Sequence, residues 1–294
     1  MLVEILYLTG GGLGNLVHSL FAIEAIKKLG HDLTVWVGTE WQGQAQFVRH
    51  DNVIVGEPPD PADFDRVFVA PYALTGSSAK WAAHFDGKAE GSPVPINGQY
   101  TEVEHNFWFA RVAGWSGLMP SPAIKTCDVS PIIGDYVVIA PGVQSGSAVW
   151  LKKRYRHWGQ VASKLFDKSI KCVFVGAKAD TDPKFDRYVN LCGETGLWEA
   201  SGVLAKARVV LAVDNGLSCV SAAIGVPTVV LWGMSDEVKN RKFGPRVRNI
   251  VSTLQCRPCQ HTELLTSCVN ANCMDTIPVQ DVVDAALAEW EGNS

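Results

Sequence analysis

The sequence predicts an α/β protein built from two doubly wound parallel sheets, and two observations carry this prediction. Short apolar runs typical of buried strands alternate with longer segments of helical periodicity. This pattern starts twice, once near residue 2 and again near residue 136, with an irregular stretch between. A chain of 294 residues is long enough for two such domains.

The first start is a strand, a glycine-rich turn and a helix. We expect the strand over Leu2–Leu8, the turn over Thr9–Asn15 (TGGGLGN), the helix over Leu16–Leu29 and a second strand over Asp32–Val37. The turn is similar to a dinucleotide-binding fingerprint but lacks its third glycine, which argues against a nicotinamide-dependent enzyme. It either clears space for a bound substrate or serves helix packing, and both interpretations stay open.

The segment after the second strand carries weaker signals. Short strands are expected near Asn52–Val55 and Arg66–Val69, and a helix over Glu104–Ala113. Residues 74–100 are rich in Gly, Ser and Pro, which predicts an irregular or mobile loop. The aperiodic stretch Pro120–Pro131 is expected to link two domains, residues 1–130 and 131–294.

The second start repeats the pattern. A strand over Tyr136–Ile139 leads into a small polar loop, and the basic run Lys152–Trp158 (KKRYRHW) is expected to open a helix that ends near Phe166. A strand over Lys171–Val175 and a helix over Glu199–Ala207 follow. We expect four strands in this sheet, with helices between them.

The clearest unit is the segment VVLAVDNGLSCVSAAIGVPTVVLWGMS (209–235). Its apolar strands, Val209–Val213 and Thr228–Trp232, enclose a short helix. Asp214 ends the first strand, at the edge where open α/β sheets bind ligands. The first amides of a helix lack partners within it, and the helix dipole adds positive charge there. Four residues could therefore hold a phosphate, namely Asn215, Gly216, Leu217 and Ser218. A helix simply capped by Asp214 or Asn215 is the competing interpretation.

The basic run Lys152–Arg156 is expected at the same edge of this sheet. Lysine and arginine there would neutralise a diphosphate that helix amides already hold. In a transfer reaction they would stabilise a diphosphate leaving group as negative charge builds on it. A solvated surface is the ordinary alternative for such a run. We see no carboxylate cluster suited to a divalent cation.

Composition narrows the class of protein. The hydrophobic content of 47% is ordinary for a globular protein, and no apolar stretch approaches a membrane span. A strand begins almost at Met1, so we see no signal peptide and expect a cytoplasmic enzyme. The net charge of −4 argues against nucleic acid as a partner, although the local basic run weakens that argument.

Five motifs resemble those of the heptosyltransferase-like glycosyltransferases, the family that extends the lipopolysaccharide inner core. They are GLGNLVH (12–18), KRYRHW (153–158), DNGLSC (214–219) with GVP (225–227), GMSD (233–236) and CRPC (256–259) with Cys273. The resemblance spans nearly the whole chain and is thin between Trp41 and Pro131. It implies a GT-B fold, in which two Rossmann-like domains face each other across a cleft. It also implies a donor on the C-terminal domain, an acceptor on the other and no metal in catalysis.

The resemblance also implies roles for individual residues. Asn15 takes the position of the family's catalytic base, and His18 is a second candidate because an amide cannot accept the proton. The residues on the acceptor side would be Gly12, Leu13, Gly14 and Asn15. The donor would contact Ser145, Lys152, Lys153, Arg154, Asp180, Asp214, Asn215, Gly216, Leu217 and Ser218. Among these, Asp180 would hold the ribose, while the loop Gly193–Leu197 would flank the base. A final helix, Val279–Trp290, could pack back on the N-terminal domain.

Four of the eight cysteines gather near the end of the chain. The spacing of Cys256, Cys259, Cys268 and Cys273 is compatible with a structural zinc site, although it is irregular. In a reducing compartment, zinc or free thiols are favoured over disulfides. In either case we expect a stabilising clip on a loop rather than a catalytic centre.

The sequence therefore predicts a glycosyltransferase. It would move a sugar from a nucleotide-diphosphate-sugar donor to a hydroxyl of lipopolysaccharide core or a related glycan, and a glycolipid acceptor would bring it to the membrane surface. Two alternatives remain. One is a non-catalytic nucleotide-sugar-binding protein, which Asn15 suggests; the other is a glycosyltransferase that acts on a modified nucleobase. The sequence does not reveal the base or the sugar of the donor.

Overall fold

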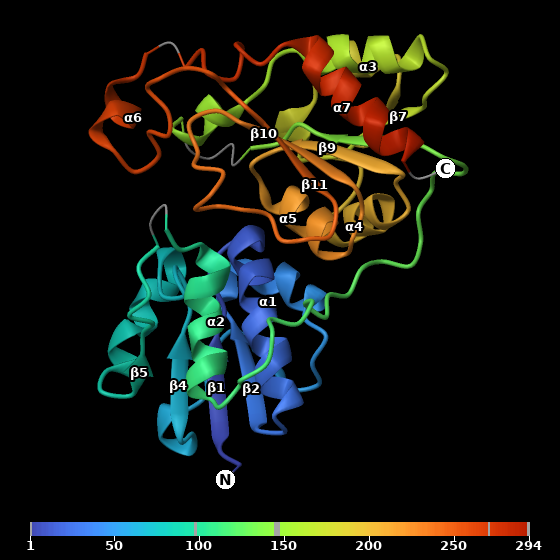
Figure 1. The fold of residues 1–294 in the computed structure, drawn as a ribbon. Helices are drawn as coiled ribbons and strands as arrows, with labels where there is room; N and C mark the ends of the chain where they lie inside the picture. Colours follow the sequence, from blue (N-terminus) through green and yellow to red (C-terminus); the bar gives the residue numbers. More distant parts are fainter. Residues whose placement is uncertain (1, 97–98, 144–147, 270, 293–294) are drawn as a thin grey trace. The chain divides into compact units, whose positions relative to one another are not determined.

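The structure is a computed structural model that describes residues 2–96, 99–143, 148–269 and 271–292. It divides into two units, Met1–Lys125 and Thr126–Ser294. Each unit is one contiguous segment of the chain and contains its own parallel sheet (Figure 1). The division falls inside the stretch Pro120–Pro131, where the sequence shows no periodicity.

The sheet of the first unit has the strand order β3-β2-β1-β4-β5, and all its pairs are parallel. The central strand β1 (Glu4–Leu8) is buried from Ile5 onward, because strands of a parallel sheet are covered on both faces. The other strands are β2 (Asp32–Val37), β3 (Val53–Val55), β4 (Arg66–Val69) and β5 (Ala89–Glu90). Two packed helices, α1 (Leu13–Lys28) and α2 (Glu102–Val112), lie beside this sheet (Figure 1).

Residues 74–100 are more ordered than their composition predicts. They contain the 3₁₀ helix η3 (Gly76–Phe85) and the short strand β5. The carboxylate of Glu40 accepts a hydrogen bond of 3.1 Å from the Ser77 amide and fixes the start of η3. Glu40 belongs to another 3₁₀ helix, η1 (Thr39–Phe47), and a third, η2 (Pro61–Asp63), precedes β4. Such short helices carry little periodicity, so the sequence pattern does not reveal them.

The sheet of the second unit has six strands in the order β11-β10-β9-β6-β7-β8, where we expected four. The two unexpected strands are the edges, β8 (Val189–Asn190) and β11 (Val247–Val251), whose partial exposure leaves no continuous apolar run. The inner strands are β6 (Val137–Ala140), β7 (Cys172–Phe174), β9 (Val209–Val213) and β10 (Thr228–Trp232). The α-helices are α3 (Trp158–Phe166), α4 (Leu197–Ala205), α5 (Gly216–Ala223), α6 (Glu263–Ser267) and α7 (Val279–Glu291).

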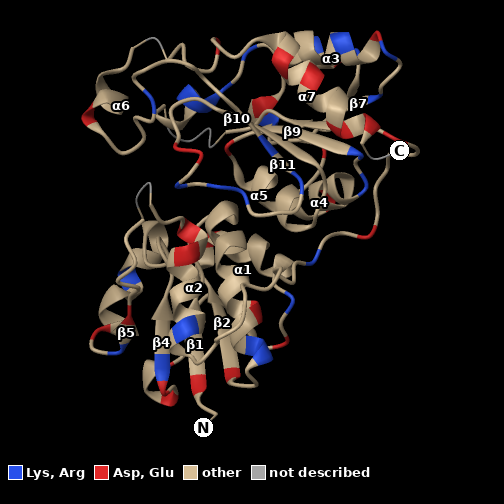
Figure 2. Cartoon of the chain, in the orientation of Figure 1, with Lys and Arg blue, Asp and Glu red and all other residues tan. Residues whose placement is uncertain are grey.

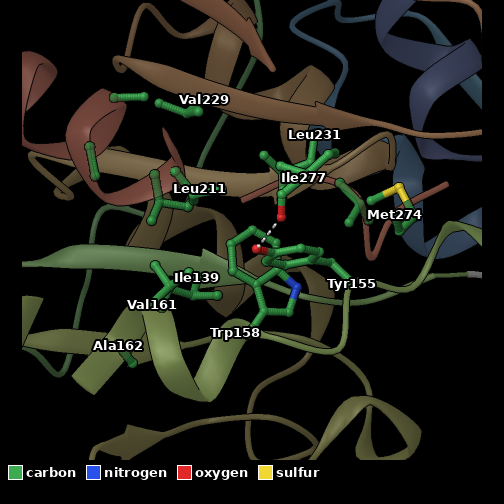
Figure 3. Close-up of a cluster of buried hydrophobic side chains, with 14 of the residues drawn as sticks. Ile139, Tyr155, Trp158, Val161, Ala162, Leu211, Val229, Leu231, Met274 and Ile277 are labelled. Atoms are coloured by element: carbon green, nitrogen blue, oxygen red, sulfur yellow. Dashed lines mark hydrogen bonds between the residues drawn. The ribbon is translucent and has the colours of Figure 1, made fainter. Parts of the chain in front are cut away.

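The basic run does not open a helix, and that expectation was wrong. The 3₁₀ helix η4 (Trp150–Lys153) and an extended Arg154 precede α3, which begins only at Trp158. Tertiary packing explains the difference. Tyr155 and Trp158 are buried edge to face with ring centroids 5.1 Å apart, and the Tyr155 hydroxyl donates to the Ile277 carbonyl at 3.0 Å (Figure 3). The intervening backbone therefore follows the core rather than a helix.

The last helix packs on its own unit. α7 contacts α3 and strands β9, β10 and β11, and its buried Val282 and Val283 join the core below α3. Arg246 and Arg248 both pair with Glu289 near the end of α7. The sequence analysis also allowed a crossing onto the first unit, whereas these contacts lie within the second. Across the described ranges, no helix is both long and apolar enough to cross a bilayer.

Candidate functional site

Asp214 ends β9 and binds two lysines at once. Lys153 Nζ lies 2.6 Å from Oδ2, and Lys242 Nζ lies 2.6 Å from Oδ1. Burial alone would raise the pKa of Asp214, but the charges and hydrogen bonds of the two lysines outweigh burial and hold that pKa well below its usual range. Two cations and one anion leave this cluster, hereafter the Asp214 cluster, with a net positive charge at the strand end.

Aromatic rings support both lysines. Lys153 Nζ lies 4.8 Å from the centre of the Trp150 ring, and Lys242 Nζ lies 5.1 Å from that of Trp232. Such cation–π contacts favour the charged form of a buried amine. The sequence analysis identified Lys153 and missed Lys242. The concentration of basic residues after GMSD (Lys239, Arg241 and Lys242) was the available signal.

Tight packing holds Lys242 in place. It lies between β10 and β11, and Gly244, two residues on, packs directly against the carbonyl of Ala222 near the end of α5. A side chain at Gly244 would collide with that carbonyl, so the segment can approach α5 only with glycine there. The side chain of Lys242 is 3% exposed as a result.

Asn215 is the N-cap of α5, as one interpretation of the sequence predicted. Its Oδ1 accepts from the Ser218 amide at 2.9 Å, and Ser218 Oγ accepts from the Asn215 amide at 3.3 Å. Its Nδ2 donates to the carbonyls of Ala140 and Gly142, which ties the ends of β6 and β9 together. The amides of Gly216 and Leu217 have no hydrogen-bond partner within the described part of the chain. The cap therefore leaves two helix amides for an anion.

The other predicted donor residues lie nearby but do not contact Asp214. Lys152 donates to the Leu265 carbonyl, and Arg154 donates to the Ala179 carbonyl at 3.1 Å. Both cations are therefore turned toward the loops around the strand ends. Ser145 lies outside the described residues.

Asp180 lies close to the ends of β6 and β7. Its Oδ2 accepts from the Ala177 amide at 2.8 Å, and its carboxyl group fills the space beside Gly142 and Gly176. Its Oδ1 is buried and has no hydrogen-bond partner among the described residues. Gly193, at the start of the predicted base-flanking loop, packs against Lys178 of the same turn. Gly142 thus connects Asp180 with the Asn215 cap.

In the first unit, the glycine-rich turn serves packing at two positions and opens space at a third. A Cβ at Gly10 would meet the Pro71 carbonyl at 2.7 Å, and one at Gly11 would meet the Tyr72 carbonyl at 2.8 Å. Gly12, with a φ of +86°, is the N-cap of α1, and a Cβ there would meet no atom within 4 Å. Leu13 is buried, while Gly14 and Asn15 are half-buried beside this opening.

Asn15 and His18 follow this turn on α1. Asn15 Nδ2 donates to the Gly11 carbonyl. The Nδ1 of His18 lies 2.8 Å from Glu102 Oε2, and both residues are buried. Glu102 is the first residue of α2 and was missed, because nothing in the sequence links it to a histidine 84 residues away.

The four clustered cysteines do not form the zinc site that their spacing allowed. Burial and neighbouring thiols raise the pKa of Cys259 and Cys273, so the thiols lie near one another. Nevertheless, the described residues contain no group of three or more His, Cys, Asp or Glu placed to hold a metal ion. All eight cysteines are free thiols. The donor set does not fit a metal centre in this arrangement.

Comparison with solved structures identifies the fold. ADP-heptose LPS heptosyltransferase II of E. coli matches with a TM-score of 0.68 at 18% identity, covering 98% of this chain and 99% of that one. The glycosyl transferase family 9 protein of Veillonella parvula matches with a TM-score of 0.74 at 14% identity, covering 99% and 98%. The E. coli iron-containing heptosyltransferase TibC, solved with ADP-D-β-D-heptose, matches with a TM-score of 0.67 at 16% identity, covering 100% and 78%. The fold is therefore that of GT-B glycosyltransferases, as the sequence predicted.

A family model gives the assignment. The model described as glycosyltransferase family 9 (heptosyltransferase) matches residues 119–269, more than half of the chain, and this range contains the Asp214 cluster. The chain belongs to this family, and the protein is a glycosyltransferase that uses a nucleotide-sugar donor. A search of curated protein sequences finds no match.

Proposed function

We propose that the protein transfers a sugar from a nucleotide-diphosphate-sugar donor, held at the strand ends of the second sheet, to a hydroxyl of lipopolysaccharide core or a related glycan. The Asp214 cluster carries this proposal. It combines two buried lysines with the N-terminus of α5 at one strand end. Family membership supports the class of reaction.

The diphosphate would bind the amides of Gly216 and Leu217 together with Lys153 and Lys242. When the bond between the anomeric carbon and the diphosphate oxygen breaks, its electron pair leaves with the nucleoside diphosphate. The negative charge of that leaving group grows during the step, and fixed cations and helix amides favour it. Asp214 neutralises one of the two lysines and fixes the position of both.

The nucleoside would extend toward Asp180. Its buried Oδ1 is a hydrogen-bond acceptor, which suits a ribose hydroxyl. We also assign donor contacts to Lys152 and Arg154 on the loops around the site and to Ser145 in the loop after β6. The loop that begins at Gly193 would flank the base.

His18 would take the proton of the acceptor hydroxyl, because the Asn15 amide cannot. A carboxylate beside Nδ1 favours the tautomer with its proton on Nδ1, which leaves the lone pair on Nε2 to act as the base. Asn15 would orient the acceptor together with Gly12, Leu13 and Gly14. The acceptor oxygen then bonds to the anomeric carbon as the diphosphate leaves.

The donor to test first is an ADP-heptose, since two of the similar structures name it. A glycolipid acceptor would bring the protein to the cytoplasmic membrane surface. The two lysines supply the positive charge that the leaving group requires in this proposal.

A thermal-shift screen tests the proposal with ADP, ADP-heptose, UDP-glucose and GDP-mannose. The correct donor should raise the melting temperature by mass action, and Asp214→Ala and Lys153→Ala should reduce that gain. Lys168→Ala, at an exposed position after α3, is the matched control. If Lys153→Ala folds and responds like wild type, the proposed donor site is wrong.

The substitution of the family's base by Asn15 also favours a second candidate function, a nucleotide-sugar-binding protein without transfer. Release of ADP from ADP-heptose, alone or with core oligosaccharide, separates the two functions. A protein that binds the donor but releases no nucleotide under any of these conditions is the binding protein.

A further inference from the structure

The two units differ in charge. Residues 1–125 contain eight Lys and Arg against thirteen Asp and Glu, a net charge of −5, whereas the remainder of the chain carries +1. A surface that binds phosphorylated or carboxylated sugars needs cations, because an anion held beside carboxylates is repelled. The unit assigned to the acceptor thus lacks the charge that a polyanionic acceptor would require.

The few cations of the first unit also lie away from its binding edge. In a parallel α/β sheet, ligands bind where the strands end. The segments that follow the strand ends are residues 9–12, 38–47, 56–65, 70–85 and 91–100, and Lys80 is their only Lys or Arg. Its Nζ lies 4.9 Å from the centre of the Trp81 ring. Acidic residues mark the start of α2 and a basic residue its end, as Figure 2 shows.

Uncharged hydrogen-bonding groups gather at this edge instead. Four buried side-chain atoms in η1 and η3 have no hydrogen-bond partner in the described ranges, namely Trp41 Nε1, Gln44 Oε1, Ser78 Oγ and Trp81 Nε1. Ser78 is 1% exposed and Gln44 is 7% exposed. Trp41 Nε1 lies against Gly11 of the glycine-rich turn, and Ser78 Oγ lies against Gly38 at the end of β2. The four atoms comprise two donors, one acceptor and one hydroxyl that can do both.

We propose that the part of the acceptor that binds the first unit is a neutral saccharide, recognised at the edge formed by η1, η3 and the glycine-rich turn. This inference rests on the proposed function and narrows its acceptor. Sugar hydroxyls both donate and accept hydrogen bonds, so they match this mixed set. Buried polar groups without partners are costly, and a neutral polyhydroxyl ligand satisfies them without bringing charge to Glu40 and Glu102.

A matched pair of acceptors tests the charge. Deacylated lipopolysaccharide core oligosaccharide is compared before and after removal of its phosphates, with binding to the full-length protein followed by calorimetry. We expect the dephosphorylated glycan to bind at least as well as the phosphorylated one. Its affinity should stay within about twofold between low salt and about 0.5 M salt, because no ion pair is screened. Tighter binding of the phosphorylated glycan, binding of a serine-rich peptide instead, or no binding of either glycan would each overturn the inference.

Variants test the place. Trp41→Phe and Ser78→Ala each remove one hydrogen-bonding group and should weaken binding of the dephosphorylated glycan about tenfold. Trp115→Phe, beyond the end of α2, is the matched control and should bind like wild type. Unchanged glycan affinity in both edge variants would sink the assignment. ADP-heptose binding is measured on the same proteins: if it fails while the glycan still binds, the proposed donor site is wrong and this inference stands.

Discussion

Lys242 reaches Asp214 from 28 residues further along the chain and forms the second half of an ion cluster that Lys153 begins. The two lysines contact different oxygens of one carboxylate, each at 2.6 Å. Their side chains are 3% and 14% exposed, so solvent screens little of the interaction. The positions of the two cations are thus coupled through Asp214.

Loss of Lys242 should weaken both donor binding and stability. In Lys242→Gln, Asp214 keeps one buried cation instead of two. We expect the affinity for ADP to fall at least about tenfold and the free energy of unfolding to fall by about 3 kcal/mol. Isothermal calorimetry and urea unfolding measure the two effects. Lys239→Gln, in the same segment, is the control, and equal behaviour of the two variants would contradict a role for Lys242.

Acid should destabilise the protein through Asp214. Its pKa is lowered in the folded state, while the unfolded chain has the usual value of about 3.9. The stabilisation is therefore fully present above about pH 4 and is lost as the pH falls further, because the unfolded state takes up the proton first. Urea unfolding at about pH 6 and about pH 3 measures it. Asp214→Asn should flatten this dependence relative to the exposed control Asp167→Asn, and parallel curves for the two variants would contradict it.

His18 and Glu102 should act together in catalysis. We expect His18→Gln and Glu102→Gln to lower kcat by about a hundredfold or more, because proton removal is lost or misdirected, while the KM for the donor stays constant. Steady-state kinetics with ADP-heptose check this. His84→Gln, on η3, serves as the control. A loss confined to KM would mean that the pair only shapes the acceptor site.

Asn15→Asp restores a carboxylate at the family's base position. Turnover should be preserved or rise, because a carboxylate beside the turn can accept the proton that an amide cannot. The measurement is the rate of ADP release at saturating donor, with donor affinity determined in parallel. Loss of turnover with intact donor binding would refute base chemistry at this position.

The buried thiols should resist alkylation. Burial raises the pKa of Cys172 and Cys192 to about 12, so almost none of either is thiolate at neutral pH. Cys256 is exposed and should react first with a thiol reagent such as DTNB, and peptide mapping identifies the modified residue. All eight thiols should react after denaturation. Early labelling of Cys172 or Cys192 in the native protein would contradict their burial.

The sequence predicted the inner framework better than its edges. β2, β4, β9 and β10 begin and end where their apolar runs do, because burial on both faces writes a strand into local composition. The edge strands β8 and β11 are half exposed and leave no such run. At the basic run, the packing of Tyr155 and Trp158 overrode the helical pattern.

The candidate site followed the same rule. Asp214, Asn215 and Lys153 lie in motifs that can be recognised within a few residues, and the structure brings them together. Lys242 and Glu102 act through partners 28 and 84 residues away, so only the fold reveals them. A single sequence carries no record of such distant pairs.

The way α7 packs sets an order for the protein's biosynthesis. The first unit is complete once residue 125 has left the ribosome, and it can fold while the rest of the chain is still being made. The second unit needs α7 to cover β9, β10 and β11, so its apolar sheet stays open until residue 291 has emerged. During that interval the nascent chain presents a finished domain joined to an uncovered sheet, the stage at which a chaperone would be most useful.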